Sequence, residues 1–315
     1  MDIDLPIKIK LPDGFLEPEV RCDYQVTKEL KELWAVELDL LSEFDRVCKK
    51  YHLQYVATGG TLLGAVRHKG FIPWDDDIDL GMKRSDYKRL CDIASEEFKQ
   101  PYFFQTEYTD PTSFRGHAQL RNSYTTAILS SENERMFNQG VFIDIFPLDN
   151  VTDDKELLSK QIKKINHLNY RAKKILLYSN YYEYEKPERV TLKYRIKKFI
   201  RYITVHFTNQ LRRISDYYYA CFERECQKYN HKRTTYMSML SFMPDNTKLY
   251  IESKDFEASI VTVKFEFLNI PILNYYDTLL TRQYGDWKRP KKVPSYHGDV
   301  FFNVRMPYVE YLKKR

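Results

Sequence analysis

The 315-residue chain has little glycine or proline, 10 and 13 residues, and five cysteines. So few glycines exclude a collagen-like or low-complexity chain. No run of 18 uncharged apolar residues occurs, so we expect no transmembrane helix, and the first residues lack the apolar core of a signal peptide. The cysteines show no zinc-ligand spacing, and we interpret them as thiols kept reduced in the cytoplasm. They are Cys22, Cys48, Cys91, Cys221 and Cys226.

Aromatic residues, in contrast, are abundant. The chain contains 26 Tyr and 19 Phe, and 43% of its residues are hydrophobic. Side chains of this kind require burial, which excludes disorder as the main state. The length fits one large domain or two ordinary ones with a sizeable core.

Charge is distributed unevenly along the chain. The formal net charge is +6, but residues 155–233 alone hold 20 basic and 7 acidic residues. The rest of the chain is therefore net acidic. An acidic body with a basic insert indicates an anionic partner, which could be a membrane surface, a nucleic acid or a phosphorylated substrate. Because no RNA-binding signature accompanies the basic residues, we expect no nucleic-acid partner.

The order of elements predicts a mixed α/β (α+β) fold. Apolar residues spaced by three and four predict a helix over 27–51. Shorter helices are expected over 61–66, from an N-cap at Ser85 to about residue 98, and over 274–283. We expect strands over 54–58, 78–82, 102–107, 118–121, 125–129 and 140–146, the last ended by Pro147, and a hairpin over 259–273.

We divide the chain into four parts on this pattern. Residues 1–26 form an extended lead-in, and 27–150 form a mixed α/β core. Residues 151–235 are a basic, mainly helical insert, interrupted near Pro187. Residues 236–315 complete the domain that contains this core.

An acidic stretch is the densest chemical signal. In an extended segment, alternate side chains share a face, so Asp77 and Asp79 would lie together, with Asp75 beside them. Carboxylates at this spacing repel one another, and a cation removes that cost. Oxygen-only ligands suit Mg²⁺ or Mn²⁺. The alternative is a solvated acidic loop.

The flanking residues favour a phosphate site. Thr58 to Thr61 join a predicted strand to a predicted helix through Gly59 and Gly60. Such a junction lets the backbone N–H groups of a helix start approach a phosphate. Asp144 lies between isoleucines in a later strand, where an acid is costly unless it is paired or metal-bound. We interpret it as a further ligand or a general base.

The run from Gly59 to Leu80, with Gly-Gly-Thr-Leu-Leu-Gly near its start and Trp-Asp-Asp-Asp-Ile-Asp near its end, is closely similar to the sequence block of the LicD family, which includes fukutin-type proteins. A second block over 119–126 resembles the family's Lys-Leu-Arg-Asp segment but has Gln119 and Asn122. Residues 284–287, Tyr-Gly-Asp-Trp, resemble a third motif, and His297 resembles a histidine that often follows it.

The resemblance implies a nucleotidyltransferase-like fold and transfer of a phospho-alcohol group from a CDP-activated donor, most often CDP-choline, to a lipid-linked or polymeric glycan such as teichoic acid, lipopolysaccharide or capsule. CMP would be released. The alternatives are another CDP-activated polyol or sugar phosphate, and a non-catalytic binding protein on the same fold. On this reading Asp75, Asp77, Asp79 and Asp144 hold Mg²⁺ or Mn²⁺. The donor contacts would be Thr58, Gly59, Gly60, Thr61, Arg67, His68, Arg121 and His297.

A basic amphipathic helix is predicted within the insert. Ile196, Phe199 and Ile200 belong to an apolar stripe, and Lys193, Lys197 and Arg201 lie beside it at a spacing of four. Such a helix can lie in the headgroup region of an anionic membrane. We therefore expect a cytoplasmic protein and hypothesise that its insert docks on the inner face of the membrane. The alternative is an ordinary packed helix with a solvated basic face.

Overall fold

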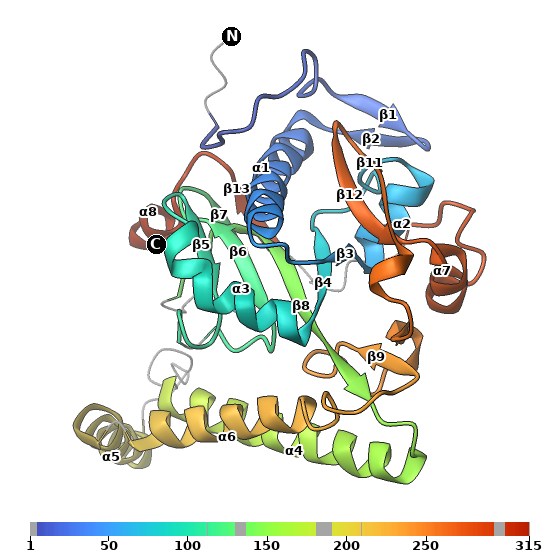
Figure 1. Ribbon diagram of the computed structural model, residues 1–315. Coiled ribbons are helices and arrows are strands. Elements are labelled where there is room, and N and C mark those ends of the chain that lie inside the picture. The colour runs from blue at the N-terminus through green and yellow to red at the C-terminus, as the bar shows by residue number, and fades with distance from the viewer. Residues whose placement is uncertain are drawn as a thin grey trace.

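The computed structural model describes residues 5–111, 113–129, 137–180, 191–208, 210–292 and 300–314. Helices surround a mixed sheet, which confirms the expected α/β class (Figure 1). The helices are α1 (Lys28–Lys50), α2 (Gly59–Arg67), α3 (Arg84–Glu97), α4 (Lys155–Asn180), α5 (Leu192–Thr208), α6 (Gln210–Cys226), α7 (Tyr276–Tyr284) and α8 (Tyr308–Lys313). No helix in the described ranges has both the length and the apolar composition needed to cross a membrane.

The central sheet is built around one long strand, β8 (Val141–Val151), which is buried along almost its whole length. Its first half pairs in parallel with β4 (Asp79–Lys83) and antiparallel with β6 (Ala118–Asn122). The end of β8 pairs with β9 (Tyr236–Ser238). The outer strands are β3 (Val56–Ala57) beside β4, β5 (Tyr102–Gln105) beside β6, and β10 (Ile251–Glu252) beside β9.

Three two-stranded ribbons complete the strand set. They pair β1 (Glu19–Arg21) with β2 (Tyr24–Val26), β11 (Ile260–Phe265) with β12 (Leu268–Leu273), and β7 (Thr126–Leu129) with β13 (Val300–Asn303). The last pair joins the C-terminal part of the chain to the strand that follows β6. The predicted hairpin over 259–273 is confirmed.

Helices α1 and α3 pack against one face of the central sheet. Thr27 caps α1 by accepting a hydrogen bond from the N–H of Leu30, and the apolar side of the helix is buried from Leu33 onward. The main core lies between these helices and the sheet. Because residues alternate along a strand, Gln119 of β6 and Asp144 of β8 point to the opposite face of the sheet.

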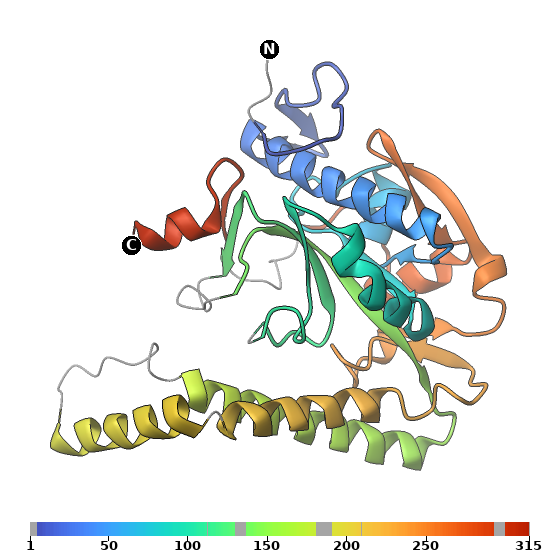
Figure 2. The same cartoon turned by 60° about the vertical axis from the view of Figure 1, so that its left-hand side comes forward.

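The basic insert forms a long helical hairpin of α4 and α6, with α5 extending beyond its end (Figures 1 and 2). A second hydrophobic core lies between α4 and α6, with Ile165 and Phe222 buried in it. Arg84 and Asp149 form a buried ion pair at the base of the insert, with 2.9 Å between Nε and Oδ1. The predicted interruption near Pro187 lies outside the described residues.

Two local predictions are wrong. Helix α3 begins at Arg84 with Lys83 as its N-cap, so Ser85 lies inside the first turn and does not cap it. Strand β8 continues through Pro147 to Val151. Pairing with β6 ends at Ile145 and pairing with β9 starts at Asp149, so the N–H that Pro147 lacks falls between the two partners.

Candidate active site

Two acidic residues face each other across the parallel strands at the centre of the sheet. Asp79 is the first residue of β4, and it lies opposite Asp144 in the register of β4 and β8. Residues paired in this way have side chains on the same face of a sheet. The fold thus brings together two acids that are 65 positions apart in the sequence.

A second acidic group precedes β4. Asp75, Asp76 and Asp77 place one carboxylate oxygen each within 4.8 Å of the others. The strand begins only at Asp79, so these three residues lie in a loop before β4 and outside the strand in which the sequence placed them. The loop gathers the three carboxylates instead, and it adds Asp76 to those that the sequence singled out.

The glycine-rich start of α2 lies directly against these acids. A Cβ on Gly59 would be 2.9 Å from Oδ2 of Asp79, and one on Gly60 would be 2.7 Å from Oδ2 of Asp75. Gly59 also has a φ of +52°, in the left-handed region that glycine tolerates best. Side chains larger than hydrogen would displace the carboxylates, which gives both glycines a steric role.

The first turn of α2 has no side-chain cap. Thr58, at the N-cap position, has a buried hydroxyl oxygen with no hydrogen-bond partner among the described residues. The hydroxyl of Thr61, in contrast, has a partner. Its Oγ1 accepts from the N–H of Asp79 at 2.7 Å, and this bond connects α2 to β4. Uncapped N–H groups at a helix start are a site for phosphate oxygens.

Asp144 is held by two neighbours on the same side of the sheet. His117 Nε2 lies 3.0 Å from Oδ1 of Asp144, and Gln119 Nε2 donates to the same oxygen at 2.6 Å. Burial opposes ionisation of Asp144, but His117 and Gln119 outweigh it, so the pKa of Asp144 is lowered. Burial raises the pKa of Asp79 well above its ordinary value, and Asp77 and Asp144 raise it further.

Glu37 is a site residue that the sequence analysis missed. It lies on α1, is 1% exposed, and its Oε2 has no hydrogen-bond partner among the described residues. One turn earlier, Trp34 Nε1 donates to the carbonyl of Asp75 at 2.9 Å, which fixes this side of α1 against the acidic loop. Burial raises the pKa of Glu37 well above its ordinary value, and the aspartates of the loop raise it further. Sequence periodicity placed Glu37 on the polar side of the helix and gave no reason to single it out.

Arg67 and His68 were predicted to contact the donor, and the structure gives both of them protein partners. Arg67 Nη1 donates to the carbonyl of Trp287 at 2.7 Å, and its Nε lies 2.8 Å from His68 Nε2. The pKa of His68 falls to about 4, because burial disfavours its cation and Arg67 repels it. His68 is therefore neutral near pH 7.

Arg121 is buried, with 1% of its surface exposed. Its Nε donates to Gln105 at 2.6 Å, its Nη1 to the carbonyl of Gly140 at 2.6 Å, and its Nη2 to Gln119. These bonds connect Arg121 to Asp144 through Gln119. The structure thus places Arg121 behind the acidic site, as a support for it. His297 lies outside the described residues.

The candidate ligand atoms suit a hard divalent cation. Every candidate ligand is a carboxylate oxygen, which is the chemistry that Mg²⁺ and Mn²⁺ prefer. The unpartnered Oε2 of Glu37 also supports a cation site, because a buried carboxylate without a protein partner needs a counter-charge. The residues present therefore fit the cation that the family resemblance implied.

Comparison with known proteins gives a consistent result. Residues 52–175 match the sequence model described as LicD/FKTN/FKRP, nucleotidyltransferase domain. The chain is 28% identical over 284 residues to the lipopolysaccharide cholinephosphotransferase LicD of Haemophilus influenzae, covering 89% of this chain and 98% of that protein. It is also 40% identical over 70 residues to an uncharacterised protein of Rickettsia prowazekii, covering 22% of this chain and 24% of that one.

Proposed function

Since this chain is a member of the LicD family, we propose that it is a phosphotransferase that moves a phospho-alcohol group from a CDP-activated donor to a glycan hydroxyl. Phosphocholine from CDP-choline is the group we favour, because the relative that spans most of the chain is named a cholinephosphotransferase. The observation that carries the proposal is the pairing of Asp79 with Asp144 beside the uncapped start of α2.

In the proposed reaction, the acceptor hydroxyl oxygen attacks the phosphorus that bears choline. The bond from that phosphorus to the bridging oxygen breaks, and CMP leaves with the bonding electrons. The hydroxyl proton passes to a base, for which Asp144 is suited, since it is ionised at neutral pH and both of its protein hydrogen bonds fall on Oδ1. The N–H groups of the α2 start hold phosphate oxygens.

Asp75, Asp76, Asp77 and Asp79 would hold Mg²⁺ or Mn²⁺. The cation would offset the charge that develops on the pyrophosphate. Gln119 and His117 keep the Asp144 carboxylate in place during the transfer. Gly59 and Gly60 leave room for the phosphate and the acids together.

The test is product analysis with the purified protein. CDP-choline, CDP-glycerol and CDP-ribitol are each incubated with Mg²⁺ or Mn²⁺ and a lipopolysaccharide or teichoic acid acceptor. Release of CMP together with modified glycan supports the proposal and identifies the donor. Release of pyrophosphate from a nucleoside triphosphate would favour nucleotidyl transfer, and no release from any donor would favour the non-catalytic alternative.

We further propose that α5 docks the enzyme on an anionic membrane, where a lipid-linked glycan is found. Residues 191–201 contain five basic residues and no acidic one. Apolar side chains on the same helix are largely exposed, with Leu192 74%, Ile196 51% and Phe199 63% exposed. Basic residues near such a surface contribute roughly 1 kcal/mol each. This pattern favours lipid over a packed helix, whose apolar stripe would be covered.

Flotation with vesicles tests the docking. The wild type should float with phosphatidylglycerol-containing vesicles and stay in solution with phosphatidylcholine alone. Phe199→Ser with Ile200→Ser should abolish flotation, whereas Val20→Ser, at an apolar residue 65% exposed on β1, should not. Equal flotation of all three proteins, or none by the wild type, would contradict the proposal.

A further inference from the structure

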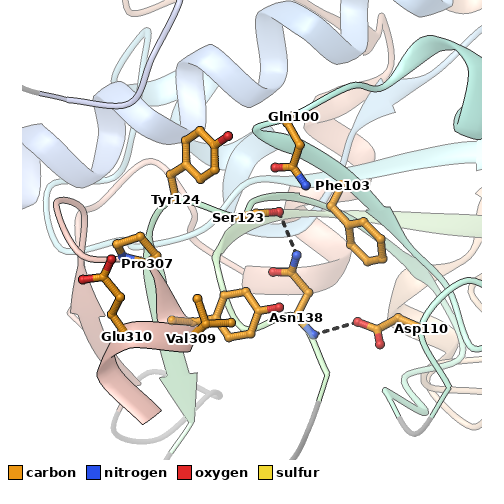
Figure 3. Close-up of a pocket in the computed structure, with 10 residues that line it drawn as sticks. Gln100, Phe103, Asp110, Ser123, Tyr124, Asn138, Pro307, Val309 and Glu310 are labelled. Carbon is orange, nitrogen blue, oxygen red and sulfur yellow. Dashed lines mark hydrogen bonds between the residues drawn. The ribbon is translucent and has the colours of Figure 1, made fainter. Parts of the chain in front are cut away.

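A cavity of about 570 Å³ opens beside the edge strand β5, away from the acidic cluster (Figure 3). Its lining comes from β5, the turn after β6, the residues before β8, and α8. Three aromatic and two acidic side chains contribute to it. They are Phe103, Tyr124, Tyr308, Asp110 and Glu310.

The cavity lies on the same face of the sheet as Asp144. In β5, Tyr102 points to the helical side, where its hydroxyl donates to Asp39 of α1. Phe103 and Gln105 therefore point to the opposite side. Gln105 is opposite Gln119, and Gln119 is opposite Asp144. Two strand spacings separate Gln105 from Asp144, which amounts to about 10 Å.

A chain of hydrogen bonds ties the cavity to Asp144. Gln105 is buried behind the lining, and its Nε2 donates to two lining residues, to Asp110 Oδ2 at 2.7 Å and to the carbonyl of Asn138 at 3.0 Å. The Oε1 of Gln105 accepts from Arg121. Arg121 also donates to Gln119, and Gln119 in turn donates to Asp144. Buried networks whose groups are paired are rigid. The cavity is thus held at a set distance from the acidic site.

The lining excludes the donor. None of the described residues that line the cavity is Lys or Arg, and Asp110 and Glu310 would repel the phosphates of a CDP compound. The alcohol of the donor is esterified to the reacting phosphorus, so it lies at the acidic site. Phe103, which lines the cavity, lies on β5, two strand spacings or about 10 Å away from β8, which carries Asp144. An acceptor polymer, in contrast, continues past its reacting hydroxyl.

We propose that this cavity binds a neutral sugar unit of the acceptor glycan, a short distance along the polymer from the unit that is modified. The inference rests on the proposed function. Tyr124 and Tyr308 offer flat apolar faces to a sugar ring. Asp110 is oriented by Gln105 and by the N–H of Asn138, both on Oδ2, which leaves Oδ1 to accept from a sugar hydroxyl. Glu310, exposed on α8, is a second acceptor.

Saturation-transfer NMR tests the binding, with lipid-free lipopolysaccharide core oligosaccharide as the probe. Tyr124 is 48% exposed, so Tyr124→Ala should fold, and Glu310→Gln is conservative. We expect transfer to the oligosaccharide in the wild type, and at least a tenfold weaker affinity in both variants. The control Tyr170→Ala changes a tyrosine on α4 that is 60% exposed and remote from the cavity, and it should bind like the wild type.

Kinetics separate this inference from the proposed function. Tyr124→Ala should raise the KM for acceptor about tenfold, and it should leave unchanged the KM for CDP-choline and the slow release of CMP without acceptor. A wild type that turns over normally, with variants indistinguishable from it, would overturn the sugar site and leave the function standing. Oligosaccharide binding without CMP release from any donor would support the sugar site and contradict the proposed function. Binding of tetramethylammonium at Tyr124 in place of the oligosaccharide would also overturn the sugar site.

Discussion

Asp79 and Asp144 are neighbours on parallel strands, yet within the described ranges only Asp144 receives side-chain hydrogen bonds, from His117 and Gln119. The pKa of Asp79 is raised by burial and by the acids around it, whereas that of Asp144 is lowered. The surroundings thus favour the neutral form of Asp79 and the ionised form of Asp144.

Asp79→Asn should lower the rate of transfer by about 100-fold or more, because a charge at the reacting phosphate is lost. The same change should raise the melting temperature of the metal-free protein, since it removes a buried, repelled carboxylate. Thermal unfolding in EDTA and CMP release measure the two effects. Near-normal turnover would contradict the role of Asp79.

The metal-free protein should lose stability as the pH rises. An acid whose pKa is raised on folding binds more protons in the folded than in the unfolded state, so the free energy of unfolding falls with pH between the unfolded and folded pKa values. For Asp79 this interval starts near its ordinary pKa, about 4. Unfolding in EDTA across this range should show the decline, and Asp79→Asn should make it shallower. An unchanged slope in the variant would show that other groups cause it.

Glu37→Gln should weaken Mn²⁺ binding about tenfold and stabilise the metal-free protein, because the buried carboxylate lacks a protein partner. Calorimetric titration with Mn²⁺ measures the first effect. The matched control is Asp39→Asn on the same helix, whose carboxylate already accepts from the N–H groups of Lys8 and Ile9 and from Tyr102. It should bind Mn²⁺ like the wild type. Equal affinity for Glu37→Gln would show that Glu37 plays no part in cation binding.

Much of the fold was predictable from local pattern. The spacing of apolar residues gave α1 nearly to the residue, and the hairpin of β11 and β12 followed from alternation. Asp77 and Asp79 were singled out by the density of acids and by the family resemblance, and Asp144 because an acid between isoleucines in a strand is unusual. Glu37, His117 and the role of Arg121 were not predictable, since each depends on which strand or loop lies opposite. Pairings across the sheet are set by tertiary contacts that one sequence does not reveal.

Gly59→Ala should reduce transfer at least tenfold, because its Cβ would meet the carboxylate of Asp79 at 2.9 Å. Gly285→Ala is the matched control, since Gly285 also has a positive φ, +70°, but no atom lies within 4 Å of its Cβ position. Both variants should lose about 1 kcal/mol of stability from backbone strain. Melting temperature and CMP release separate strain from steric displacement. A similar loss of activity in both would assign the effect to strain alone.

Arg121→Lys tests whether Arg121 supports Asp144 from behind or contacts the CDP-activated donor. Lysine cannot satisfy Gln105, Gln119 and the carbonyl of Gly140 together, because it lacks the planar fork of donors. Breaking such a buried charged network costs about 3–5 kcal/mol, so the melting temperature should fall strongly. At a temperature where the variant is folded, the maximal rate should fall because Gln119 no longer orients Asp144, while the KM for CDP-choline should stay within about twofold of the wild-type value. A large rise in that KM with unchanged stability would instead return Arg121 to the donor contacts that its motif suggested.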